Sequence, residues 1–222
     1  MAVYALRLLV ERALGLLLFL LGSSWRLGPC ATLWFVAYFG AAVCGAGLYV
    51  LNADLMDRRA DIASTKDVTP IWDKVILALF WLLAYFVIYF VAGKSVPAST
   101  PIGPAAIVGV VIYAASTALT FWALRTNAYA ESVSRLQSER GQTVCDAGPY
   151  AHVRHPMYSA ILMWCVSVVL VFPSPAVACV SFAVLVLIVV RTLLEDEMLA
   201  RGLAGYKSYR TRVPWRLVPH VF

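Results

Sequence analysis

Six long apolar runs are the feature of this chain that most limits its fold. They cover residues 5–23, 31–51, 75–92, 102–124, 157–172 and 175–191. A membrane-spanning helix needs about 20 mainly apolar residues, so the first four runs are long enough and the last two are shorter. Of the 222 residues, 62% are hydrophobic and only 14% charged, against about 25% charged in soluble domains. The sequence therefore predicts an all-α integral membrane protein with about six transmembrane helices, ending in a short helical hairpin over 157–191.

The basic residues predict how these helices are oriented. Of the 18 Lys and Arg residues, 16 fall in the N-terminal segment, the loops 52–74 and 125–156, and the C-terminal tail, whereas Arg26 and Lys94 fall in the opposite connections. Basic residues are enriched on the cytoplasmic side, so we expect a multi-pass protein with both termini cytoplasmic, in the inner membrane if the source is bacterial. The net charge of +6 then indicates contact with anionic lipid headgroups, and no nucleic-acid partner is expected.

Two smaller features predict the absence of a metal or disulfide scaffold and a minor role for the first charged pair. The five cysteines are scattered without metal-ligand spacing, so we expect neither a disulfide nor a metal site. Glu11 and Arg12 lie early in the first apolar run. We expect both to reach back to the cytoplasmic surface, with a functional role inside the membrane as the alternative.

Chemically informative residues gather after residue 124. This change in character divides the chain into an N-terminal part of four spans (1–124) and a C-terminal core (125–222) made of a polar loop, the hairpin and a tail. The loop ends in Gly-Pro-Tyr at 148–150 and Arg-His-Pro-Met-Tyr at 154–158. Pro156 suits the first turn of a helix and places His155 at its cap, a position that favours anions. The alternative is that these residues only anchor the chain at the membrane interface.

A second group of candidate residues follows the hairpin. Arg191 and Glu195 lie one helical turn apart on a helix that we expect to continue out of the membrane. They are either an ordinary ion pair four residues apart or two ligand contacts on a rigid support. Tyr206, Tyr209 and the Arg-Val-Pro at 212–214 then form an aromatic and basic strip that would suit covering a site at the interface.

Taken in order, these motifs resemble the isoprenylcysteine carboxyl methyltransferase family, which includes relatives of phospholipid N-methyltransferases. The resemblance covers 125–216, about 40% of the chain. It implies an integral-membrane methyltransferase that binds S-adenosylmethionine in a cytoplasmic pocket made by the loop, the hairpin and the tail.

The resemblance also implies roles for individual residues. Arg191 would face the substrate as the catalytic residue. The cofactor contacts would be Gln137, Gln142, Thr143, Val144, Cys145, Tyr150, His155, Pro156, Met157, Tyr158 and Glu195.

The expected reaction is carboxyl O-methylation of an isoprenylcysteine-like or other lipidic, amphiphilic substrate. A carboxylate is already nucleophilic, whereas an amine must lose a proton, and the sequence offers no obvious base for that step. Three alternatives stay open: N-methylation of a phospholipid or other amine, a sterol-reductase-like enzyme that binds a dinucleotide, and a non-catalytic membrane protein. Tight binding of S-adenosylhomocysteine would separate the first from the other two. The oligomeric state and the methyl acceptor are left open by the sequence.

Overall fold

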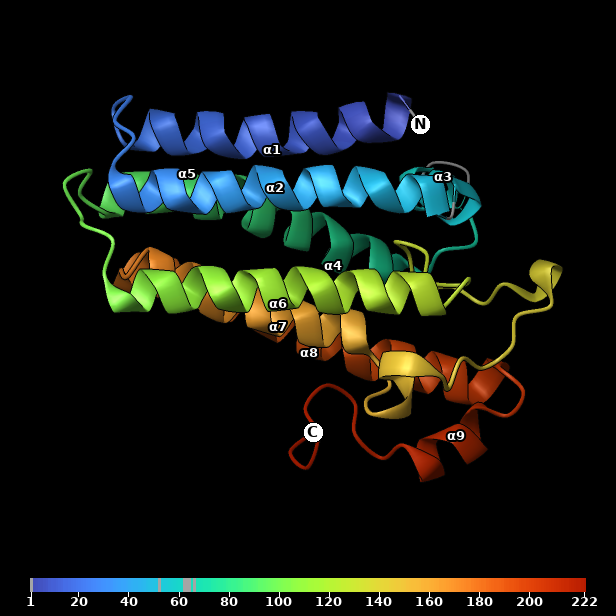
Figure 1. Ribbon diagram of the computed structural model, residues 1–222. Coiled ribbons are helices and arrows are strands. Elements are labelled where there is room, and N and C mark those ends of the chain that lie inside the picture. The colour runs from blue at the N-terminus through green and yellow to red at the C-terminus, as the bar shows by residue number, and fades with distance from the viewer. Residues whose placement is uncertain (1, 52, 62–64, 66) are drawn as a thin grey trace.

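The computed structural model describes residues 2–51, 53–61, 65 and 67–222, which form a bundle of long helices (Figure 1). Every regular element among these residues is helical, as the sequence predicts. The long segments are α1 (Ala2–Gly22), α2 (Pro29–Leu51), the continuous α4 (Ile71–Trp81), η1 (Leu82–Val87) and α5 (Ile88–Ser95), α6 (Pro104–Thr126), α7 (Pro156–Val171) and α8 (Pro175–Gly202). The short helices are α3 (Ala53–Ala60), η2 (Ser138–Arg140), η3 (Gly148–Ala151) and α9 (Tyr206–Arg212). Each predicted apolar run corresponds to one long segment.

Several of these helices are suited to a membrane. Four segments of the described chain are long and apolar enough to cross one: Pro29–Leu48, Ile71–Ser95, Pro104–Thr126 and Pro175–Gly202. Helix α7 has 16 residues and rises only about 24 Å. Four apolar spans indicate an integral membrane protein, while six crossings and the orientation of the termini stay predictions.

Prolines set where most of these helices begin. Pro29, Pro104, Pro156 and Pro175 each occupy the first position of a long helix. Proline lacks the N–H that the first turn leaves without an intrahelical partner, and its fixed φ already suits a helix. Ser174 adds a cap to α8, because its side chain accepts a hydrogen bond from the N–H of Val177. The helix starts therefore follow from local sequence.

Glycines let α1 approach the α5 segment closely. A Cβ on Gly22 would overlap the carbonyl oxygen of Phe90, and one on Gly93 would overlap that of Phe19. A core of buried residues, which includes the aromatic side chains of Trp34 and Phe172, packs α1, α2, α5 and α7 together near this contact. Such backbone contact between small residues is the usual way to pack helices in lipid.

One end of the bundle carries the polar parts of the chain. Helix α3, the segment 127–155 and α9 all lie at this end, with the first residues of α1, while the short connections 23–28 and 96–103 lie at the other (Figure 1). We call the former the loop end. Helix α8 runs on to Gly202 and reaches it, which confirms the predicted continuation of this helix beyond residue 191.

Candidate active site

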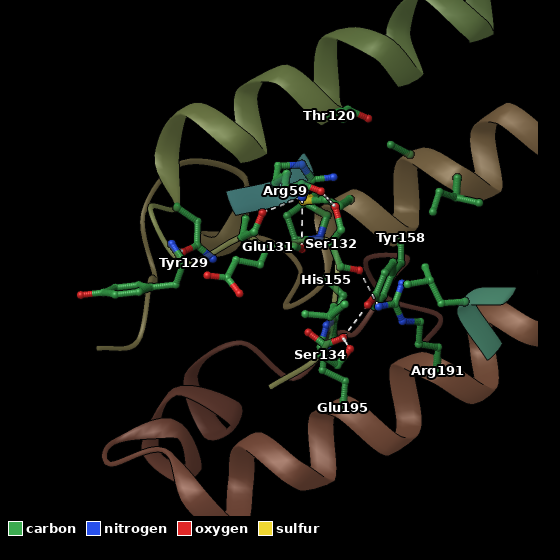
Figure 2. A pocket seen from close by; sticks show the side chains of 18 of the residues that line it. Arg59, Thr120, Tyr129, Glu131, Ser132, Ser134, His155, Tyr158, Arg191 and Glu195 are labelled. Carbon is green, nitrogen blue, oxygen red and sulfur yellow. Dashed lines mark hydrogen bonds between the residues drawn. The ribbon is translucent and has the colours of Figure 1, made fainter. Parts of the chain in front are cut away.

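A cavity of about 360 Å³ extends from the loop end into the bundle, and Figure 2 shows part of its lining. This volume lies within the usual range for small-molecule sites. Residues from both predicted parts of the chain line it, and all twelve candidate site residues are among them: Gln137, Gln142, Thr143, Val144, Cys145, Tyr150, His155, Pro156, Met157, Tyr158, Arg191 and Glu195. The structure thus brings together residues that are up to 58 positions apart in the sequence.

Glu195, on α8, lines the loop-end part of this cavity. Its Oε2 accepts hydrogen bonds from the hydroxyl of Tyr158 and, at 2.6 Å, from that of Ser134 (Figure 2). No described residue donates to Oε1 of Glu195. A carboxylate held by two hydroxyls, with one oxygen left over, is oriented to accept from a hydroxyl or amino group of a ligand.

Arg191 lies beside this carboxylate, but its ion-pair partner is Asp73 and not Glu195, the residue one helical turn away. Its Nε donates to Oδ1 of Asp73 at 2.8 Å and its Nη2 to the carbonyl oxygen of Ser132 at 2.9 Å. The ion pair with Glu195 is absent from the described residues. The guanidinium instead lies 5.4 Å from the ring centroid of Tyr158. Arg191 is therefore fixed in two directions, which a single-point cation could not match.

Asp73 links Arg191 to the loop. This carboxylate is 0% exposed, and its second oxygen accepts the backbone N–H of Ser134 at 2.9 Å. The hydroxyl of the same serine donates to Glu195. One buried acid on α4 thus positions two side chains that α8 presents to the cavity.

The neighbouring Asp196 organises the opposite wall. It is 2% exposed and accepts two bonds from Arg154, from Nε at 2.8 Å and from Nη2 at 3.0 Å. The hydroxyl of Tyr206 donates to it at 2.9 Å and the Nε of Arg216 at 3.2 Å, and the Nε2 of His155 lies 3.4 Å away. We call these five residues the Asp196 cluster. It ties the start of α7, the end of α8 and the tail into one support.

The first turn of α7 presents a donor to the cavity. His155 is the cap residue, and its ring stacks on Tyr158 with the two centroids 5.6 Å apart. Pro156 has no N–H, and the N–H groups of Tyr158 and Ser159 donate back to the carbonyl of His155. The N–H of Met157 is the remaining first-turn donor, and Met157 is one of the residues that line the cavity. This geometry matches the anion-favouring helix start that the sequence predicts.

The loop that closes the cavity is built around Gln137. This side chain is 2% exposed; its Nε2 donates to the carbonyl of Tyr129 at 2.8 Å, and its backbone N–H donates to Oε1 of Gln142 at 2.8 Å. Both glutamines therefore shape the loop from within. Burial raises the pKa of the Cys145 thiol, which favours its protonated form at neutral pH.

Tyrosines from the tail seal the same region. The hydroxyl of Tyr209 donates to the carbonyl of Tyr150 at 2.7 Å, and all three of Tyr150, Tyr206 and Tyr209 are buried. Burial raises the pKa of each, and for Tyr206 the adjacent Asp196 carboxylate raises it further. These phenols therefore stay neutral at physiological pH.

Three important residues escaped prediction from the sequence. Asp196 has an acidic residue on each side in the sequence, which hides it. However, Ile188, Thr192 and Asp196 are spaced four residues apart and all are buried, so helical spacing from the apolar part of α8 could have identified Asp196 as facing inward. Asp73 gave only the weak signal of an acid in a first helical turn. Arg12 was expected at the membrane surface, and that expectation is wrong: its guanidinium lies inside the bundle, 4.1 Å from the ring centroid of Tyr38.

Comparison with known proteins places this site in a family. Residues 107–201 match the isoprenylcysteine carboxyl methyltransferase (ICMT) family, and no curated protein matches the chain. The match spans the candidate residues from Gln137 to Glu195 and ends before α9. It indicates methyltransferase activity at a membrane. The predicted resemblance to the isoprenylcysteine carboxyl methyltransferase family is confirmed over residues 107–201.

Proposed function

We propose that the protein is a membrane methyltransferase that uses S-adenosylmethionine and methylates the carboxylate of a lipidic, amphiphilic substrate. The observation that carries this proposal is the gathering of all twelve candidate residues around one cavity. In this proposal Arg191 is the catalytic residue and the other eleven contact the cofactor. A methyl on a sulfonium centre is the electrophile that the cofactor supplies when bound.

The residues present fit this cofactor. Glu195 has one oxygen that no described residue uses, suited to a ribose hydroxyl or an amino group. The N–H of Met157 at the start of α7 is suited to the cofactor carboxylate. The faces of Tyr150 and Tyr158 give apolar walls, and each ring is buried.

The acceptor would lie on the other side of Arg191. Its planar guanidinium can hold a carboxylate with two parallel hydrogen bonds, and Asp73 fixes its plane. Methyl transfer is an in-line displacement, so the work of these residues is to align the two reacting atoms and to exclude water. A carboxylate needs no base, and among the described residues the acids near the site are already engaged by hydroxyl or cationic donors.

Calorimetry with S-adenosylhomocysteine in detergent tests the proposal. Glu195→Gln should weaken binding about tenfold to a hundredfold, because a lost hydrogen bond to a charged group is worth about 1.5–3 kcal/mol. Glu197→Gln is the matched control: it lies on the same helix, its side chain is 52% exposed, and it pairs with Arg201 at the surface. Equal losses in both variants, or binding of NADPH in place of S-adenosylhomocysteine, would contradict the proposal. Labelled S-adenosylmethionine with a membrane lipid extract would then identify the acceptor.

A further inference from the structure

The cavity continues past Glu195 to a second polar region deep in the bundle. This deep end is lined by Arg12 on α1, Tyr38 on α2, Tyr85 on η1, Tyr89 on α5 and Tyr113 on α6. The guanidinium of Arg12 lies over the Tyr38 ring. Five polar side chains from five helical segments thus converge where the surroundings are otherwise apolar.

The polar atoms of the deep end are incompletely satisfied. Nε of Arg12 is buried without a hydrogen-bond partner among the described residues. The hydroxyls of Tyr38 and Tyr89, in side chains only 2% and 1% exposed, likewise lack a well-formed hydrogen bond and have each other as polar neighbours. Buried donors are nearly always paired, so three orphaned donors at one place point to a missing acceptor.

The charge of Arg12 is also uncompensated. None of the ion pairs of the described chain includes it, and Glu11, its neighbour in the sequence, lies about 100° away around the helix. A cation–π contact offsets part of the cost of an arginine in this position but supplies no hydrogen-bond acceptor. Ionisable residues that face the interior of an apolar helix bundle often mark a ligand or ion site.

The deep end is remote from the reacting groups. Asp73, which holds Arg191, and Tyr85, which lies beside Arg12, belong to the same continuous helix. Twelve residues separate them, which corresponds to about 18 Å at 1.5 Å per residue. A group bound by Arg12 is therefore not the one that is methylated.

One helix links the two ends of the cavity, and the deep end also has an irregular helix beside it. Helix α6 presents Tyr113, Thr117 and Thr120 at helical spacing along the lining, and Figure 2 shows Thr120 at the side of the site. Tyr85 lies in η1, a π-helical stretch within an otherwise α-helical segment. Such irregularities are frequent at functional sites, and this one lies at the level of Arg12.

We infer that the deep end is an oxyanion site for the far end of the methyl acceptor. Arg12, Tyr38 and Tyr89 would hold a carboxylate or phosphate group, joined by an apolar chain to the carboxylate that Arg191 orients. This inference rests on the proposed function, because it takes the acceptor to occupy this cavity. It predicts a substrate with polar groups at both ends and disfavours a purely hydrocarbon tail.

Binding of linear α,ω-dicarboxylic acids of increasing chain length, measured by calorimetry in neutral detergent without cofactor, tests this inference. Once the chain spans the two sites, the diacid should bind at least tenfold more tightly than the monocarboxylic acid of equal length. Arg12→Gln should remove this advantage, and Arg26→Gln, which alters an arginine outside the cavity, should keep it. A chain with a phosphate monoester at its far end distinguishes the two oxyanions: tighter, Arg12-dependent binding assigns the site to phosphate, and weaker binding assigns it to carboxylate.

Two outcomes would overturn the inference: no advantage of the diacid at any length, or an advantage that Arg12→Gln leaves unchanged. If Arg12→Gln does not fold, Tyr38→Phe and Tyr89→Phe can be used, because they remove only the hydroxyls. If both variants still bind the diacid more tightly than the monocarboxylic acid, by the same factor as the wild type, the inference is also overturned. Binding of S-adenosylhomocysteine is measured on the same samples and should be unaffected by Arg12→Gln. Its absence from the wild-type protein would refute the proposed function separately, because the diacid measurement needs no cofactor.

Discussion

Replacing Asp73 by Asn tests whether the buried pair with Arg191 supports the site. Asn keeps one acceptor oxygen where Asp73 uses two, one for Arg191 and one for the N–H of Ser134, and it leaves the guanidinium without a counter-charge. Breaking a buried pair on one side costs about 3–5 kcal/mol. At about 2 °C per kcal/mol for a chain of this size, the unfolding temperature in detergent should fall by at least about 6 °C. Methyl transfer should fall with it, since Arg191 loses one of its two anchors.

A second substitution separates stability from chemistry. In the double variant Asp73→Asn/Arg191→Met both charges of this pair are removed, so much of the thermal stability should return while activity stays lost. Asp54→Asn is the matched control, because its partner Arg58 is at the surface and exposed pairs contribute little. An unfolding temperature and turnover that Asp73→Asn leaves at wild-type values would refute the reasoning. So would a double variant that is active.

Two further predictions concern topology and backbone strain. A cysteine placed at Lys94 should react with a membrane-impermeant maleimide only from the side opposite the C-terminal tail. If a cysteine at position 94 and a cysteine in the tail are labelled from the same side, the six-span arrangement is refuted. Gly148→Ala should lower the free energy of unfolding by about 1–3 kcal/mol. Gly148 has φ +55°, and an added Cβ would also lie 2.8 Å from Oγ1 of Thr126 and 3.0 Å from Nε1 of Trp122. Gly141→Ala, with φ +61° but open space around it, measures the strain alone, and an equal loss there would show that the contact contributes nothing.

The sequence predicts the helices well because their causes are local. Apolar length sets each segment, and prolines such as Pro104 and Pro156 set the starts. The candidate residues at the loop end could be found because they cluster in two short stretches. Long-range pairing could not be found in this way: Asp73 and Arg191 lie 118 positions apart, and no local pattern joins them.

Arg12 shows a second limit of sequence interpretation. A charge one to two turns into an apolar run is compatible both with reaching the surface and with facing the bundle interior. The rotation of α1 decides between them, and that rotation depends on the contacts of Gly22 and Gly93 with the opposing backbone. Sequence periodicity alone could not supply it, because α1 is apolar around most of its circumference.

The Asp196 cluster has a consequence for how the protein is assembled. Arg154 and His155 also donate backbone hydrogen bonds to the carbonyls of Trp215 and Arg216, so the segment 213–217 completes a wall whose other parts belong to α7 and α8. The segment 213–217 follows α8 in the chain, so this wall can be completed only after all the long helices have been made. Loss of the residues from 213 onward would leave every long helix intact and one side of the cavity open.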